Sequence, residues 1–282
     1  MATNWFPGHM AKALREMKEM LKQVDLVIET CDARIPAASR NPELVRLIQN
    51  KPSLLVLNKE DLADPAVTRL WLEQFASQGL EALPCSSIRR LGCKQIVLAA
   101  KRLTQDKTDR ALAKGRIFRP VRILVAGIPN TGKSTLINAL SSRKAAQTAD
   151  KPGVTRQLSW IKAGPLELLD SPGVLWPRID SQLQQRHLAA TGAIKDNLLS
   201  GEDIARQTLE ELCRLYPDLI RQRFRIDPLA ADLDRLEQAA VSRGCLMSGG
   251  RADIERFAAL FLDELRGGRI GRISLEKPGA AG

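Results

Sequence analysis

Residues 127–134 have the residue types and the spacing of a phosphate-binding loop. Two glycines enclose four residues and are followed by Lys133 and Ser134. Such a loop turns several backbone N–H groups toward phosphate oxygens, and the helix that follows adds positive potential at its N-terminus. The lysine would reach the β- and γ-phosphates, and the serine hydroxyl would bind Mg²⁺. We therefore predict a nucleotide phosphate site formed by Asn130, Thr131, Gly132, Lys133, Ser134 and Thr135.

The residues on both sides of this loop supply the context that the motif requires. An apolar run at 121–126 predicts a strand before the loop, and residues 134–140 have the spacing of a helix after it. The alternative is a chance glycine loop between a strand and a helix. The correct strand–loop–helix context argues against that alternative.

A second group of polar residues predicts which base is bound. Asn58, Lys59 and Asp61 follow a predicted strand at 53–57, and loops at the C-terminal ends of parallel strands bind ligands in open α/β sheets. The carboxylate of Asp61 can accept hydrogen bonds from two N–H groups of guanine that adenine does not offer. Asn58 can contact the other base edge, and the Lys59 stem can cover the ring. Together with the phosphate loop, this pattern predicts guanine selectivity.

Ser86 and Ser87 are the candidates for a further contact with the guanine base. They follow a predicted strand at 82–85, where a GTPase has its last base-contacting loop. The match to the usual Ser-Ala-Lys pattern is loose. A plain turn explains these two serines equally well.

Two segments after the phosphate loop have the types of residue that bind Mg²⁺ and sense the γ-phosphate. Residues 152–156 resemble a switch segment in which Thr155 adds its hydroxyl to Mg²⁺ while the γ-phosphate is present. Residues 170–173 fit Asp-x-x-Gly. Asp170 would reach Mg²⁺ through water, and the Gly173 N–H would face the γ-phosphate. The predicted metal site is thus Ser134, Thr155 and Asp170.

The order of these elements along the chain is reversed relative to ordinary GTPases. The guanine elements at 58–61 and 86–87 precede the phosphate elements, which begin at residue 127. The order requires a circular permutation of the same doubly wound sheet, which is tolerated because packing of the elements builds the site. The second switch segment then leads directly into whatever follows residue 175.

Taken with this order, several segments resemble YlqF/RbgA-type ribosome-biogenesis GTPases. The segments are the opening Trp-Phe-Pro-Gly-His-Met at 5–10, the Asp-Ala-Arg-Ile-Pro loop at 32–36 and the tail. The resemblance implies binding of GTP and GDP and a late role in assembly of the large ribosomal subunit, which would stimulate hydrolysis. RsgA, another permuted bacterial type, has an OB-fold and a zinc site, for which this chain has neither the room nor the ligands.

The position after Asp-x-x-Gly is Val174, whereas Ras-type enzymes have a water-orienting Gln there. The resemblance therefore points to the hydrophobic-substituted GTPases, and it implies His9 as the catalytic group. Docking of the N-terminal segment on the sheet is an equal alternative for His9. Asn130 matches GTPases that K⁺ stimulates, so K⁺ is a candidate cofactor beside Mg²⁺.

The 282 residues carry a net charge of +11, and its distribution is uneven. Residues 1–180 contain 28 Lys and Arg against 17 Asp and Glu, whereas the remainder contains 15 of each. Residues 89–122 hold eleven basic side chains and only two acidic ones, Asp106 and Asp109. Such an excess is typical of a surface that binds a polyanion, although an ordinary basic linker is the alternative.

After residue 177 the spacing of apolar residues is helical, which predicts a small all-α domain. We expect a permuted GTPase domain at 1–178 and a helical domain at 179–282. By resemblance the helical domain binds ribosomal RNA, although its neutral charge allows only a local basic face. The candidates for that face are Arg221, Arg223, Arg225 and Arg243.

The predicted fold is therefore a doubly wound α/β P-loop sheet, permuted, with a small all-α C-terminal domain. The five scattered cysteines and two histidines favour a reducing cytosol over a zinc site, and no apolar run has the length of a membrane span. We expect a cytoplasmic monomer. A GTP switch acting on a protein partner is the alternative function, and an ATPase or small-molecule kinase is a second, which residues 58–61 argue against.

Overall fold

The computed structural model describes residues 7–115, 119–141, 160–171, 173, 179, 181–194, 200–230 and 234–279, without the side chains of 7–14. Its contacts divide the chain into two compact units. Unit 1 consists of Met1–Arg178 and Glu276–Gly279, and unit 2 is built on Ile179–Leu275. None of the helices that the structure describes is long and apolar enough to cross a membrane.

Unit 1 contains a six-stranded sheet with the order β3-β2-β1-β4-β6-β5. Every neighbouring pair is parallel except β5 and β6, which are antiparallel. The strands are β1 (Leu26–Asp32), β2 (Ser53–Asn58), β3 (Ala82–Cys85), β4 (Val121–Ala126), β5 (Trp160–Ala163) and β6 (Leu166–Asp170). The direction of strand order reverses between β1 and β4, and crevices at such a point bind ligands in doubly wound sheets.

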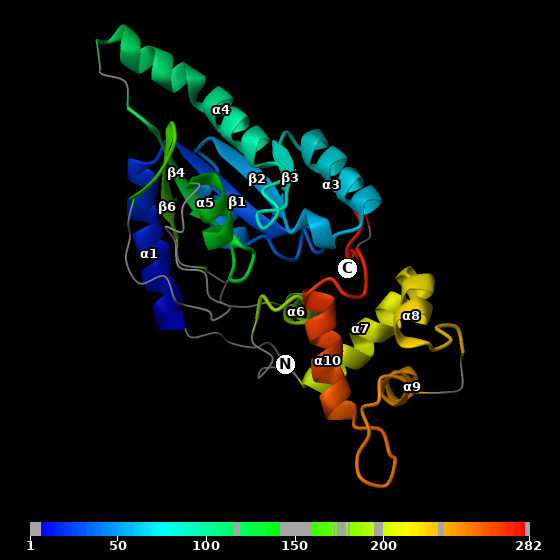
Figure 1. The fold of residues 1–282 in the computed structure, drawn as a ribbon. Helices are drawn as coiled ribbons and strands as arrows, with labels where there is room; N and C mark the ends of the chain where they lie inside the picture. Colours follow the sequence, from blue (N-terminus) through cyan, green and yellow to red (C-terminus); the bar gives the residue numbers. More distant parts are fainter. Residues whose placement is uncertain are drawn as a thin grey trace. The chain divides into compact units, whose positions relative to one another are not determined.

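Helices cover both faces of this sheet (Figure 1). α4 (Cys93–Ala113) and α5 (Lys133–Ser141) pack on one face, against the side chains of Ile28, Val56 and Val125. Successive side chains of a strand point to opposite faces of a sheet, so the neighbours of these residues point to the other face. There they pack against α1 (Pro7–Gln23), α2 (Pro42–Ile48) and α3 (Pro65–Ser77). The strands are buried on both faces, as expected for a parallel sheet.

The two outer helices of unit 1 show how local sequence sets helix length. α1 begins at Pro7, because proline fits the first helical turn. α4 continues to Ala113. Its last ten residues are mainly Ala, Lys, Arg, Gln, Thr and Asp, several of which are good helix formers. Much of the basic stretch at 89–122 is therefore helical.

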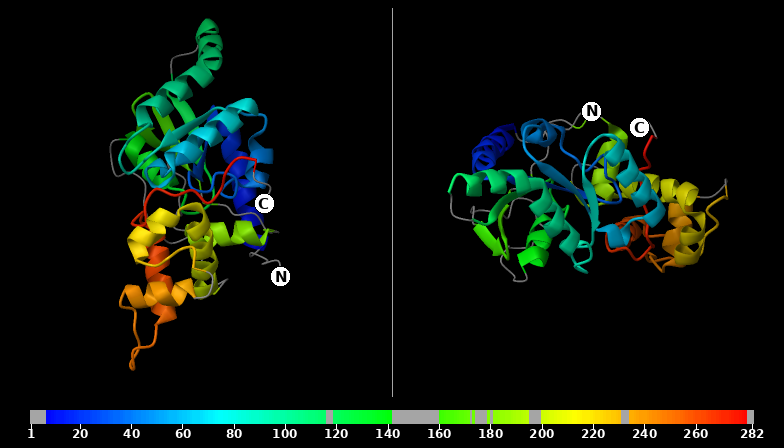
Figure 2. Two further views of the ribbon diagram at one scale, coloured as in Figure 1. Left: turned by 90° about the vertical axis from the view of Figure 1, so that its right-hand side faces the viewer. Right: turned by 90° about the horizontal axis from the view of Figure 1, so that it is seen from above.

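Unit 2 is a group of helices, seen from two further sides in Figure 2. They are α6 (Gln182–Ala190), α7 (Gly201–Leu215), α8 (Pro217–Phe224), α9 (Arg235–Ser242) and α10 (Ile254–Arg266). α8 has only eight residues, too few for a helical repeat of apolar side chains to be recognised in the sequence. Its Phe224 nevertheless enters the core and lies 5.7 Å from Phe257 and 5.8 Å from Phe261, measured between ring centroids.

The chain returns to unit 1 after the helical unit. The carboxylate of Glu276 accepts hydrogen bonds from the backbone N–H groups of Ala37 and Ala38, and its carbonyl accepts one from the Trp71 indole at 3.1 Å. Residues 276–279 therefore belong to the GTPase-like unit by contact, although they lie close to the end of the sequence.

We expect Phe257→Ala to lower the free energy of unfolding of the helical unit by about 3–5 kcal/mol, because the fully buried ring leaves a cavity between two other rings. Thermal unfolding followed by circular dichroism would measure the effect. Leu229→Ala, at a side chain that is 71% exposed, is the matched control and should change stability by less than about 0.5 kcal/mol. Equal losses in the two variants would contradict a core role for the ring.

Candidate nucleotide site at the carboxyl edge of the sheet

The predicted phosphate loop follows β4 directly and leads into α5, at the point where strand order reverses. Gly127 and Gly132 have φ of 151° and 88°, which side chains rarely adopt. A Cβ atom on Gly132 would lie 2.3 Å from the Asn58 amide nitrogen, and one on Gly127 would lie 2.5 Å from the Thr30 carbonyl oxygen. Both glycines are therefore required by close approach of neighbouring segments as well as by backbone conformation.

The ammonium group of Lys133 lies inside the loop and donates to the Ile128 carbonyl at 2.8 Å. Burial lowers the pKa of Lys133 to about 8, although the Asp170 carboxylate opposes the shift. The ammonium of Lys133 thus contacts a neutral carbonyl, and the Asp170 carboxylate only partly compensates for its burial. Phosphate oxygens would supply a further counter-charge and favour the protonated ammonium.

Ser134 and Asp170 are brought together as the sequence predicted for two metal ligands. The Ser134 hydroxyl donates to Oδ2 of Asp170 at 2.9 Å, while Oδ1 is buried and has no hydrogen-bond partner among the residues that the structure describes. Burial raises the pKa of Asp170, and the Ser134 hydrogen bond and the Lys133 charge oppose that rise. A buried carboxylate oxygen without a partner beside a hydroxyl is a set of hard donors that fits Mg²⁺.

Gly173 lies against the same loop. A Cβ atom there would be 3.0 Å from both Nζ of Lys133 and Cα of Pro129, so a side chain at this position would require the phosphate loop to shift by a few tenths of an ångström. Asn130, with φ of 60°, and the half-buried Thr135 complete the predicted phosphate residues that the structure describes.

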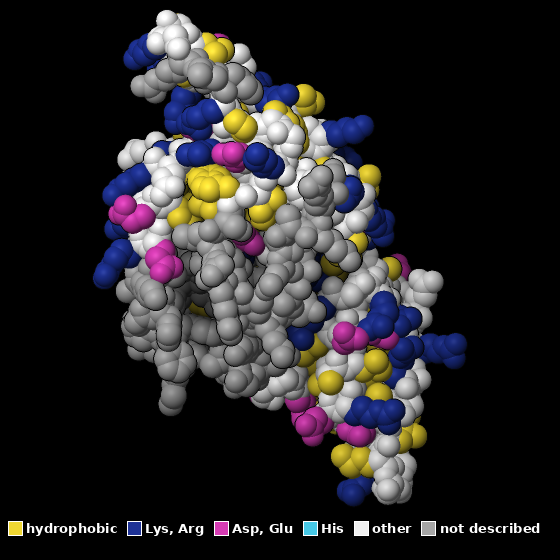
Figure 3. All heavy atoms as spheres, turned by 60° about the vertical axis from the view of Figure 1, so that its left-hand side comes forward, with side chains coloured by type: hydrophobic (Ala, Val, Ile, Leu, Met, Phe, Trp, Pro, Cys, Tyr) yellow, Lys and Arg dark blue, Asp and Glu magenta, His cyan; other side chains and the backbone are white. Residues whose placement is uncertain are grey.

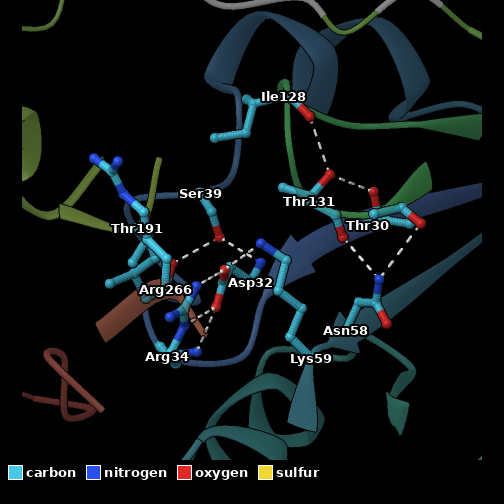
Figure 4. A network of polar contacts seen from close by, with 12 residues as sticks. Thr30, Asp32, Arg34, Ser39, Asn58, Lys59, Ile128, Thr131, Thr191 and Arg266 are labelled. Atoms are coloured by element: carbon cyan, nitrogen blue, oxygen red, sulfur yellow. Dashed lines mark hydrogen bonds and ion pairs between the residues drawn. The ribbon is translucent and has the colours of Figure 1, made fainter. Parts of the chain in front are cut away.

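The side chain of Asn58 connects the phosphate loop to the predicted base loop. Its Nδ2 donates to the Thr131 carbonyl at 2.8 Å (Figure 4), and its Oδ1 accepts from the backbone and the hydroxyl of Ser87 at 3.2 and 2.7 Å. Asn58 is 2% exposed. The amide thus braces two loops against each other, whereas the sequence pattern suggested a contact with the base edge.

Lys59 adopts a left-handed conformation, with φ of 58°, and its ammonium pairs with Asp32 at 3.1 Å. Asp32 also receives two hydrogen bonds from the guanidinium of Arg34, at 2.9 and 2.8 Å. Burial alone would raise the pKa of Asp32, but the charges of Arg34 and Lys59 hold it well below its usual range. This buried ionic cluster fixes the direction of the Lys59 stem.

Asp61 and Ser86 both have partners within the predicted base loop. Asp61 lies in the short 3-10 helix Glu60–Leu62, and its carboxylate is 3.4 Å from Nε of Arg89. Ser86 is fully buried and exchanges two backbone hydrogen bonds with Leu91, at 3.1 Å each. The loop is therefore closed on itself, with the Arg89 guanidinium over the carboxylate that was predicted to bind guanine.

Three predicted catalytic or switch positions lie outside this description. His9 belongs to the first turn of α1, but its side chain is outside the described residues. Thr155 and Val174 are outside them as well. Their roles remain predictions.

Three of the four predicted RNA-binding arginines have acidic partners within unit 2. Arg223 and Arg243 both pair with Glu264, which is 2% exposed. Arg221 pairs with Asp218 at 2.8 Å. Arg225 is exposed and ends α8 in a left-handed conformation. Arg223 and Arg243 thus neutralise a buried carboxylate, a structural task that their positions in the sequence did not reveal.

Residues 122–223 match the family model described as "50S ribosome-binding GTPase". The whole chain is 47% identical to Ribosome biogenesis GTPase A of Priestia megaterium, over 100% of this chain and 99% of that protein. The chain belongs to the ribosome biogenesis GTPase A family. It is therefore a GTP hydrolase.

Solved structures of this family have the same fold. The GNP-bound YlqF from T. maritima is 29% identical, with a TM-score of 0.66 over 95% of this chain and 99% of that one. A GDP-bound YlqF structure is 28% identical, with a TM-score of 0.67 over 94% of this chain and 99% of that one. The permuted α/β sheet predicted from the order of the motifs is confirmed.

Sequence inspection gave no role to Thr30, Asp32 or Arg34, although all three support the site. The Thr30 hydroxyl shares a 2.8 Å hydrogen bond with that of Thr131 in the phosphate loop. Polar residues at the carboxyl end of the buried strand β1 were the available indication, because that end meets β4 in a parallel sheet.

We expect Asn58→Ala to weaken binding of GDP and of 7-deaza-GDP by the same factor, because the bracing of both loops is lost and a contact with the N7 edge of the base is not. The buried Thr131 and Ser87 groups would lose their partner, which lowers the free energy of unfolding by about 1–3 kcal/mol. Fluorescence titration and thermal unfolding would measure the two effects. Asn50→Ala, at an exposed residue, is the control. A larger loss of affinity for GDP than for 7-deaza-GDP would indicate a direct contact between Asn58 and N7 of guanine instead.

We expect GDP binding to take up protons above about pH 8, because Lys133 is partly neutral in the free site and charged beside phosphates. Affinity should therefore weaken as the pH rises through that value and be constant below it. Calorimetry in two buffers of different ionisation enthalpy would measure the uptake. Guanosine, which has no phosphate, should bind without proton uptake. Binding of GDP without proton uptake would refute the proposed contact between Lys133 and the phosphates.

Proposed function

We propose that this chain uses a Mg²⁺-dependent GTP cycle to control a late step in assembly of the large ribosomal subunit, in the cytoplasm and as a monomer. The observation that carries the nucleotide part is the Ser134–Asp170 pair, 2.9 Å apart, beside a buried Lys133 on a glycine-bounded loop. Membership of the ribosome biogenesis GTPase A family supports the ribosomal part.

Ser134, Asp170 and Thr155 are the proposed Mg²⁺ ligands. When bound, Mg²⁺ would neutralise charge on the phosphate oxygens. The chain itself contributes the Lys133 ammonium and the backbone N–H groups of the loop, which orient the phosphates. Asp61 and Lys59 are the proposed guanine contacts. Ser87 and Asn58 support them through the hydrogen bonds that join the two loops.

His9 is proposed to orient the attacking water, because Val174 has no polar group for that task. It lies in the first turn of α1, a helix that packs on the sheet through Met17 and Met20. Asn130 in the phosphate loop is the basis for proposing K⁺ as an activating ion. Without a stimulating particle, hydrolysis should be slow.

We expect purified large ribosomal subunits to stimulate GTP hydrolysis, and we expect His9→Ala to remove most of that stimulation while GTP binding is retained. A positioned acid–base group contributes on the order of 10²–10⁴-fold to a rate, so a loss of at least about tenfold should be seen in a phosphate-release assay. Lys18→Ala, at an exposed residue of the same helix, is the matched control.

The same assay tests the ions and the partner separately. Removal of Mg²⁺ by a chelator should abolish turnover, and replacement of K⁺ by Na⁺ at equal ionic strength should reduce it. Stimulation that survives His9→Ala would keep the ribosomal partner and leave His9 a docking role. No stimulation by either ribosomal subunit would overturn the ribosomal part of the proposal.

A further inference from the structure

One stripe of α4 changes character along the helix. Ile96, Ala100 and Leu103 face the sheet and pack in its core. The same stripe continues at i+4 and i+7 from Leu103, where it carries Lys107 and Arg110 instead of apolar residues. The end of α4 runs past the edge of the sheet, as Figure 1 and the left view of Figure 2 show. The basic half of the stripe therefore lies beyond the apolar core, and its Lys107 and Arg110 line a pocket.

A pocket of about 260 Å³ lies under this overhang. Its floor is the start of β4 and the residue before β1, Asp25, whose carboxylate pairs with Lys107 at 2.6 Å and with Arg119 at 2.8 Å. Its wall is the last part of α4, with Thr108, Arg110 and Lys114. Since both strands begin here, the pocket lies at the opposite edge of the sheet from the phosphate loop.

The charge of this pocket is strongly positive. Among the lining residues that the structure describes, Asp25 is the only acidic one, against four basic ones, Lys107, Arg110, Lys114 and Arg119. Arg110 and Lys114 are exposed and make no ion pair with any residue that the structure describes. Burial and the nearby Lys107 charge lower the pKa of Lys51, which donates to the Val24 carbonyl beside Asp25. The basic side chains of this pocket therefore outnumber the carboxylates that pair with them.

We propose that this overhang pocket binds the phosphate backbone of RNA. The row from Lys107 to Lys114 extends about 10 Å along the helix, which suits a chain of phosphates better than one compact anion. Lys and Arg side chains also surround this end of the unit on the face shown in Figure 3. The inference rests on the proposed ribosomal function, because ribosomal RNA would supply the phosphates. It places a contact with that RNA on unit 1.

The test compares Arg110→Gln/Lys114→Gln with the wild-type full-length chain. The probe is a fluorescein-labelled duplex RNA hairpin, and anisotropy titrations at several KCl concentrations give the salt dependence of the binding constant. Loss of two phosphate contacts should lower the slope of log K against log salt by about 1.4–1.8 and weaken binding on the order of tenfold. Basal GTP hydrolysis should not change, because neither residue is near the nucleotide.

Lys18→Gln/Arg69→Gln is the matched control, since it removes two exposed positive charges from α1 and α3. It should leave the salt slope near the wild-type value. Equal slopes in the wild type and the pocket variant would overturn the proposal that the pocket binds RNA. The proposed ribosomal function would be unaffected by that result. Full competition by inorganic phosphate at a constant ionic strength would make a small anion the occupant instead. A wild-type chain that binds no RNA and ignores large subunits would remove the proposed function as well.

Discussion

The side-chain amide of Asn58 joins two loops that meet only in the folded chain. It donates to the carbonyl of Thr131, 73 residues away in sequence, and accepts from Ser87. The phosphate loop and the base loop are thereby held at one separation by groups of the chain itself. Binding then needs less reorganisation, which is the general advantage of a preorganised site. Gly132 is part of the same constraint, because a larger residue would occupy the position of the amide.

The sheet explains why the reversed order of the motifs does not harm the site. β1 pairs with β2 on one side and with β4 on the other, so the carboxyl ends of all three strands share one edge. Each strand delivers its loop there, whichever comes first in the chain. A circular permutation preserves this edge, because it changes the connections and leaves the pairing unchanged. The return of Glu276 to unit 1 adds a contact from near the chain's end.

Basic residues of this chain serve two physical tasks that composition does not separate. Arg34, Arg223 and Arg243 neutralise buried or nearly buried carboxylates, and removing such a partner would strand a charge in a poorly solvated site. Arg110 and Lys114 instead stay in solvent at the end of α4. The three arginines of the first group are already paired with carboxylates in the folded chain. Arg110 and Lys114 have no such partner among the described residues, so their charges are available to a ligand.

The sequence alone determined the phosphate loop, the Asp170–Gly173 segment, the permuted α/β sheet and most of its strands, because short motifs and apolar periodicity act through local backbone geometry. Tertiary structure decided which hydrogen-bond and ion-pair partners the polar side chains have. It gave Asn58 a bracing role, paired Lys59 with Asp32, enclosed Arg223 with Glu264 and extended α4 beyond the sheet. Those outcomes depend on residues that are far apart in the chain, and hydrogen bonds between distant side chains leave no periodic pattern in a sequence.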